Sequence, residues 1–73
     1  MSTPAEIRSP AVGTILEIPV SVGDRVSTDD ELIIIESMKV EIPVTAPRDG
    51  TVEAIAVGIG DQVEEDAPLL TLA

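Results

Sequence analysis

The chain has no cysteine, no histidine and no aromatic side chain, and each absence removes a class of function. Histidine is the usual general base near neutral pH, and cysteine supplies thiolate nucleophiles and sulfur ligands for metals. A chain of 73 residues also has little room for a substrate cleft. We therefore expect one non-catalytic domain over residues 1–73, with any chemistry supplied from outside the chain.

Basic residues are scarce as well. Four lysines and arginines stand against fourteen carboxylates, and the net charge is −10. This charge repels phosphate backbones and anionic headgroups, and no aromatic ring is present to stack on a base, so we expect neither nucleic acid nor membrane partners. No strictly apolar run exceeds four residues, which is far too short for a membrane-spanning helix. A cytoplasmic location is the expected default.

The sequence consists of one motif written twice. Shifted by 37 positions, residues 1–36 align with residues 38–73 without a gap, and only Ser37 lies between the copies. The match is clearest where residues 9–14 lie over 46–51 and residues 18–26 lie over 55–63. Because neither copy can bury an apolar face alone, we expect the two to pack on one another with quasi-two-fold symmetry.

Positions that are apolar in both copies indicate the core. Several recur at a spacing of two, which is typical of half-buried strands: Ile7/Val44, Ile18/Ile55, Val20/Val57, Val22/Ile59, Ile33/Leu70 and Ile35/Leu72. Ile34 aligns with Thr71 and is expected to point outward. The pattern predicts short strands through residues 18–22 and 55–59, among others.

Turn residues separate these strands. Gly23-Asp24 and Gly60-Asp61 are typical of tight turns. Thr28 to Glu31 resembles a helix capping box, but the second copy has Pro68 at the position of Glu31, which favours a strand. The predicted fold is an all-β, flattened antiparallel barrel or sandwich.

Lys39 is the sole lysine and lies at the junction of the two copies. The symmetry places the chain ends at one end of the domain and the junction, Ser37 to Lys39, at a hairpin turn at the other. A lysine at such a tip is accessible to a large partner. The alternative interpretation is an ordinary solvated surface charge.

The segment from Glu36 to Pro43 resembles the biotinyl domains of biotin carboxyl carrier proteins. Met38-Lys39 matches the family motif, whereas Val40 stands where the family has a second methionine. The glycine turns and residues 46–50 are similar to the family too, so the likeness spans nearly the whole chain. It implies two four-stranded sheets, biotin attached to Lys39, and Met38 and Val40 as flanking recognition residues.

The resemblance also implies partners and a function. The chain would be a biotin carboxyl carrier that shuttles a carboxyl group between enzymes of a biotin-dependent carboxylase, of acyl-CoA type. A biotin protein ligase would modify it, and a biotin carboxylase and a carboxyltransferase would use it. We expect a stand-alone carrier, monomeric when isolated and without an insertion in the turn at residues 21–31.

Other interpretations remain open. The related lipoyl domains typically have aspartate before the modified lysine, where this chain has Met38, so biotin is favoured over a lipoyl carrier. An unmodified interaction domain of the same fold is a further alternative. The acidic runs at residues 29–31 and 64–66 lack the spacing of a calcium loop, and we interpret them as solvated turns, with no metal site expected.

Overall fold

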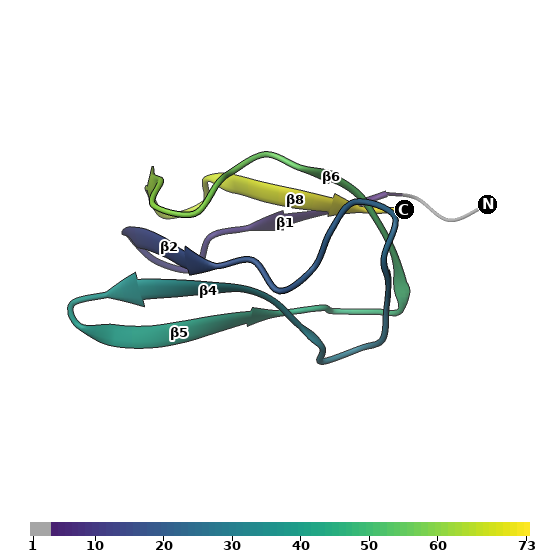
Figure 1. Ribbon diagram of the computed structural model, residues 1–73, viewed down its shortest axis with the longest axis horizontal. Coiled ribbons are helices and arrows are strands. Elements are labelled where there is room, and N and C mark those ends of the chain that lie inside the picture. The colour runs from purple at the N-terminus through teal and green to yellow at the C-terminus, as the bar shows by residue number, and fades with distance from the viewer. Residues whose placement is uncertain (1–3) are drawn as a thin grey trace.

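The computed structural model describes residues 4–73, which form eight β-strands and no helix (Figure 1). The strands are β1 (Ala5–Arg8), β2 (Gly13–Glu17), β3 (Arg25–Val26), β4 (Glu31–Ser37), β5 (Val40–Thr45), β6 (Gly50–Ile55), β7 (Gln62–Val63) and β8 (Pro68–Leu72). The predicted all-β class is confirmed, and β4 begins at Glu31, where a helix was rejected. Within residues 4–73 nothing resembles a membrane-crossing helix.

Two four-stranded antiparallel sheets make up the domain. Their strand orders are β1-β8-β6-β3 and β5-β4-β2-β7. The 37-residue offset maps each strand of the first sheet onto one of the second: β1 onto β5, β8 onto β4, β6 onto β2 and β3 onto β7. Each sheet therefore combines strands of both copies, so the copies interleave instead of forming one sheet each. Residues 1–3 of the first copy lie outside the described part of the chain.

The two glycine turns lock the copies together. Gly23 N–H donates to the carbonyl of Val52 at 2.8 Å, and Val52 N–H donates back to Asp24 at 2.9 Å. The repeat mates make the same pair of bonds, from Gly60 to Ile15 and from Ile15 to Asp61, each at 2.8 Å. Each turn thus contributes to the backbone pairing of the other copy.

Both turns need a left-handed backbone. Gly60 has φ +92°, and a Cβ built on it would meet no atom within 4 Å, so a side chain here is opposed by backbone strain alone. We expect Gly60→Val to lower the free energy of unfolding by about 1–3 kcal/mol in chemical denaturation. Gly58→Val is the matched control, because Gly58 lies in the same loop without a positive φ. Equal losses in the two variants would contradict the strain.

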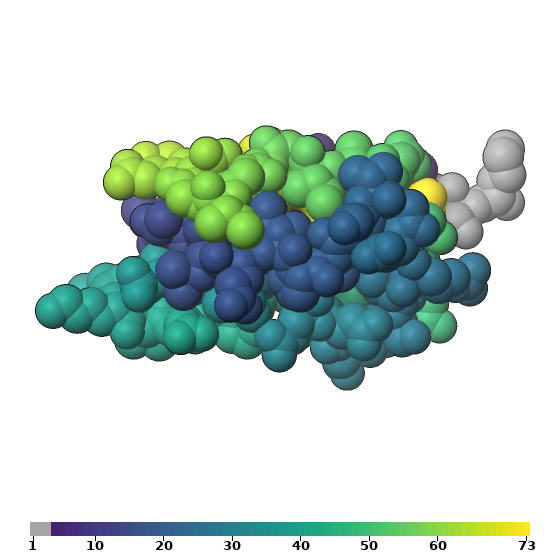
Figure 2. All heavy atoms as spheres, in the orientation of Figure 1, coloured from purple at the N-terminus to yellow at the C-terminus, as the bar shows by residue number. Residues whose placement is uncertain are grey.

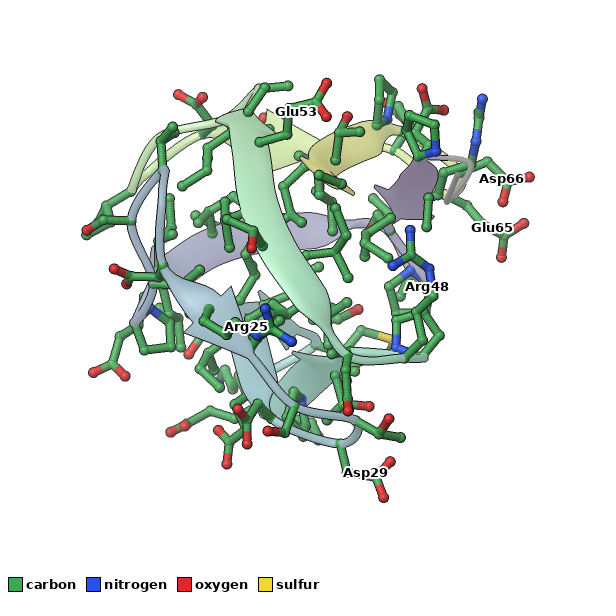
Figure 3. All side chains as sticks on the ribbon, turned by 90° about the vertical axis from the view of Figure 1, so that its right-hand side faces the viewer. Arg25, Asp29, Arg48, Glu53, Glu65 and Asp66 are labelled. Atoms are coloured by element: carbon green, nitrogen blue, oxygen red, sulfur yellow. The ribbon has the colours of Figure 1, made fainter. Side chains whose placement is uncertain are left out.

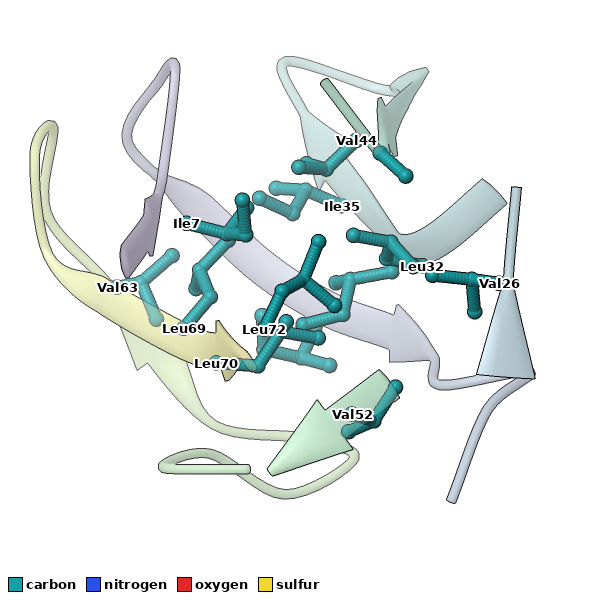
Figure 4. Packing of buried hydrophobic residues seen from close by; sticks show 13 residues of the cluster. Ile7, Val26, Leu32, Ile35, Val44, Val52, Val63, Leu69, Leu70 and Leu72 are labelled. Carbon is teal, nitrogen blue, oxygen red and sulfur yellow. The ribbon is translucent and has the colours of Figure 1, made fainter. Parts of the chain in front are cut away.

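Apolar side chains fill the space between the sheets (Figure 4). The predicted core residues Ile7, Ile33, Ile35, Val44, Leu70 and Leu72 are all buried. The cluster further contains Ile15, Val26, Leu32, Ala46, Val52, Val63 and Leu69. Its members come from both inner faces, as a two-layer sandwich requires.

Adjacent core residues occur because the strands contain irregularities. Leu32 and Ile33 are both fully buried, although neighbouring residues of a regular strand point to opposite faces. The register of β4 against β5 shifts between Glu31 and Ile33, which lets both side chains turn inward. The same shift occurs in β8 opposite β1, where Leu69 and Leu70 are both buried.

The strands predicted through residues 18–22 and 55–59 are wrong over most of their length. β2 ends at Glu17 and β6 at Ile55, and the residues that follow carry no strand. The reason is topological: β2 and β3 belong to different sheets, as do β6 and β7, so these segments cross from one sheet to the other. Ala56 N–H still donates to the carbonyl of Leu69 on β8 at 2.8 Å, but no regular ladder continues beyond it. Ile18, Val20, Ile55 and Val57 still pack against the core. Val22 and Ile59 do not, with 61% and 70% of their surfaces exposed.

Ile34 lies on the outer face, but it is more buried than expected. It is only 7% exposed and therefore not a solvent-facing residue, although it lies outside the main core cluster. Its partners across the ladder are Pro43 on β5 and Glu17 on β2. Because Ile34 lies on a central strand, the side chains of both neighbouring strands stand beside it on the outer face.

The domain is elongated, measuring 38 × 17 × 17 Å. Figure 1 shows the β4–β5 turn at one end, and the start of β1 and the C-terminus at the opposite end, as the repeat predicted. Ala5 pairs with Leu72 there. We call the two ends the lysine end and the terminal end.

Polar side chains close the terminal end, which faces the viewer in Figure 3. Arg48 Nη1 donates to the carbonyls of Asp49 and Ala73, each at 3.0 Å. Asp49 Oδ1 accepts from the backbone N–H of Thr28 at 2.7 Å and from its hydroxyl at 3.0 Å. These two hydrogen bonds, with a smaller contribution from Arg25, hold the pKa of Asp49 below its usual value.

Candidate functional site

The β4–β5 hairpin ends in a turn of two residues, Met38 and Lys39. Ser37 and Val40 are the last pair of the ladder. Met38 has φ 52° and Lys39 has φ 66°, which is the pattern of a type I′ turn with both central residues left-handed. Glycine and asparagine are favoured at these positions, and each other residue there costs on the order of 1–3 kcal/mol. The hairpin thus holds Lys39 in a defined but strained conformation.

The turn is highly exposed. The exposed fraction is 93% for Met38 and 59% for Val40, and Lys39 is exposed as well. Figure 2 shows the hairpin, in teal, projecting beyond the rest of the lysine end. Within residues 4–73 the Lys39 side chain makes no hydrogen bond or ion pair, so its amine is unencumbered. Such an amine suits covalent acylation by a partner enzyme.

The base of the hairpin is anchored in the core. Ile35 pairs with Ile42 and is fully buried in the core. One step nearer the turn, Glu36 and Glu41 lie directly opposite each other, and both are exposed. Facing like charges destabilise a sheet. These carboxylates therefore do not stabilise the hairpin, and they make the surface beside Lys39 acidic.

The acidic runs at residues 29–31 and 64–66 lie in or beside turns. Among residues 4–73 no three carboxylates come together in an arrangement that could hold an ion. Asp29 and Asp66 occupy left-handed turn positions, with φ 72° and 68°, which aspartate tolerates better than most residues. Asp30 Oδ2 accepts from Ser27 N–H at 2.8 Å. The acidic runs are thus parts of turns, as interpreted from the sequence.

Gly13 has a role that the sequence did not indicate. Gly13 starts β2 and lies against β4. A Cβ on Gly13 would collide with the carbonyl oxygen of Glu36 and approach Ile35 Cγ2 to 2.7 Å. The missing side chain therefore allows β2 to lie close against the base of the lysine hairpin. A Cβ on its repeat mate Gly50 would likewise lie 2.8 Å from the carbonyl oxygen of Ala73. The presence of glycine at this position in both copies was the only sign of this role in the sequence.

Comparison with known proteins agrees with this geometry. Residues 5–72 match the family model described as "Biotin-requiring enzyme". A biotinylated protein TB7.3 homolog of Mycobacterium leprae is 46% identical over 41 residues, which cover 56% of this chain and 58% of that protein. Biotinylated protein TB7.3 of Mycobacterium tuberculosis is 42% identical over the same shares. The matched stretch thus spans less than two thirds of these relatives.

Two solved structures share the fold. Urea carboxylase of Kluyveromyces lactis superimposes with a TM-score of 0.93 at 32% identity, covering all of this chain and 6% of that one. A single-chain, multi-domain long-chain acyl-CoA carboxylase gives a TM-score of 0.89 at 25% identity, covering 93% of this chain and 7% of that one. The predictions of a biotinyl-type fold and of biotin as cofactor are confirmed. The chain belongs to the family of biotin-requiring enzymes.

Proposed function

We propose that Lys39 is the site of biotin attachment and that the domain is the carboxyl carrier of a biotin-dependent carboxylase. The observation that supports this most strongly is the position of the sole lysine, in a two-residue turn with an unencumbered side chain. The match to a biotin-requiring family supplies the identity of the group. Met38 and Val40, exposed on either side, are the residues that a modifying enzyme would contact first.

A biotin protein ligase would join the Lys39 amine to the activated carboxyl group of biotin through an amide bond. The amine loses its positive charge in this step, while the negative charges of Glu36 and Glu41 beneath it remain. The modified tip therefore has a more negative net charge. The bound biotin supplies a ureido nitrogen that accepts and releases a carboxyl group. The domain contributes no catalytic residue to that chemistry.

The role of the fold is to present the arm. A rigid hairpin that projects from the body lets the group reach a biotin carboxylase and then a carboxyltransferase, while tethering keeps its local concentration high. The charge of −10 favours encounter with basic surfaces of these partners. An acyl-CoA is the proposed carboxyl acceptor, supported by the likeness to the acyl-CoA carboxylase.

The proposal is tested by the intact mass of the chain after coexpression with a biotin protein ligase. We expect one biotinyl increment, because the chain has one lysine and the only other amine is its N-terminus. Fragmentation should place the increment on Lys39. An unchanged mass, or an increment that appears only with a lipoate ligase, would contradict biotin attachment.

A further inference from the structure

A pocket of about 230 Å³ opens beside the lysine hairpin. It is lined by residues of β2 and β7 and their flanks: Val12, Gly13, Thr14, Gln62, Val63 and Glu64. In Figure 2 the dark blue segment that contains residues 12–14 lies between the teal hairpin and the yellow-green segment around residue 62. The pocket therefore belongs to the lysine end of the domain.

The register of the sheet connects this pocket with Lys39. Thr14 of β2 is the cross-strand partner of Glu36 on β4, and Thr14 also pairs with Gln62 on β7. Cross-strand partners point to the same face, so Thr14 and Gln62 share a face with the base of the hairpin. Adjacent strands are about 4.8 Å apart. A long group on Lys39 has only to fold back across one or two strands to reach the pocket.

The repeat shows why the pocket is open at this end. At the terminal end the mate of Ala11 is Arg48, whose Nη1 lies 3.0 Å from the position of a Cβ on Gly50 and donates to the carbonyl of Ala73. The mate of Val12 is Asp49, whose carboxylate is bonded to Thr28. The long Arg48 side chain therefore reaches over the position equivalent to Gly13. Ala11 is too short to do so.

The lining suits the bicyclic ring of biotin. Val12, with 58% of its surface exposed, offers apolar surface to a thioether ring, and Val63 adds the small part of its surface that is not buried. Thr14 and Gln62 carry donors and acceptors for a ureido group, and the Glu64 carboxylate is an acceptor for ureido N–H groups. The volume lies below the 300–1,000 Å³ typical of pockets for drug-sized ligands, in keeping with a ligand as small as one bicyclic ring system.

We propose, building on biotin attachment at Lys39, that this pocket receives the ring of the domain's own biotinyl arm. The arm then rests against β2 and β7 between visits to partner enzymes. A docked arm must leave the pocket before it enters an active site. Its apparent affinity for a partner is therefore the intrinsic affinity multiplied by the fraction of time that the arm is free.

Amide chemical shifts of the ¹⁵N-labelled chain test this docking, once its mass has shown that biotin is attached. We compare the biotinylated chain with one acetylated at Lys39, because acetylation removes the same charge without adding a ring. Docking predicts that the amides of residues 12–14 and 62–64 shift only with biotin. Differences confined to residues 38–40 would overturn the pocket assignment while leaving biotin attachment intact.

An Ala11→Arg variant provides the complementary test, since it copies the residue that covers the equivalent position at the terminal end. We expect it to be biotinylated normally but to lose the shifts at residues 12–14 and 62–64. Streptavidin should capture its freed arm at least about twofold faster than the wild-type arm. Ala54→Arg, which adds the same charge to an exposed position of the other sheet, is the control.

Should Ala11→Arg fail to fold, Glu64→Ala removes a polar partner of the ring at an exposed position instead. It should reduce the biotin-dependent shifts at residues 12–14 and speed capture by streptavidin. Unchanged shifts and an unchanged capture rate in the variant that folds would refute the pocket.

Discussion

A Lys39→Arg variant coexpressed with a biotin protein ligase is expected to show no biotinyl increment in its intact mass. Arginine keeps the positive charge and the approximate length of the side chain, but its guanidinium stays protonated and is not acylated as the lysine amine is. No second lysine is present to replace it. The loss of modification should therefore be complete, while the free energy of unfolding stays within about 0.5 kcal/mol of wild type.

A lysine introduced at another position tests whether modification depends on the hairpin turn or only on the presence of an amine. In the Lys39→Arg background, Arg25→Lys restores one amine on the exposed short strand β3, outside any two-residue turn. We expect this double variant to remain unmodified, because the proposed recognition depends on an amine presented between Met38 and Val40. Biotin attached to either variant would show that the ligase does not recognise the lysine of the hairpin turn specifically.

An Ile35→Ala variant is expected to lose about 2–5 kcal/mol of unfolding free energy, since its side chain is fully buried between the sheets. A domain of 73 residues has roughly 4–11 kcal/mol in total at the usual stability per residue. The substitution therefore removes a large part of the stability. Urea denaturation followed by circular dichroism in the far ultraviolet measures the change.

The consequence should extend to the lysine. Ile35 anchors β4 four residues before Lys39, so a destabilised core also loosens the strained turn, and we expect slower biotinylation of this variant. Val40→Ala is the matched control on the same hairpin, because Val40 is 59% exposed and its loss should change stability by less than about 0.5 kcal/mol. Equal destabilisation by both substitutions would mean that the core is not organised around β4.

The candidate site follows closely from the sequence, because it depends on local information. Lys39 is the sole lysine and lies beside the junction of two copies. A two-fold repeat must place its junction and its ends at opposite poles, so the lysine could be assigned to an exposed hairpin before any coordinate was known. The left-handed conformations of Met38 and Lys39 could not be assigned, since neither residue type favours them.

The core was predictable in part. Ile7, Ile35 and Leu72 each align with an apolar residue in the other copy, and all three are buried. Val22 and Ile59 satisfy the same criterion but are exposed, because periodicity does not reveal where a chain leaves one sheet for the other. Likewise, no local pattern marks the register shifts that turn both Leu32 and Ile33 inward.

By itself the sequence determined the strand class, the 37-residue repeat and the lone amine at its junction, because spacing, composition and symmetry are properties of the chain alone. Only the tertiary structure decided that each sheet takes strands from both copies, and that Gly13 must lack a side chain to lie against β4. It also decided that a pocket stays open beside the lysine. These features depend on contacts between residues distant in sequence, and such contacts exist only once the two copies have interleaved.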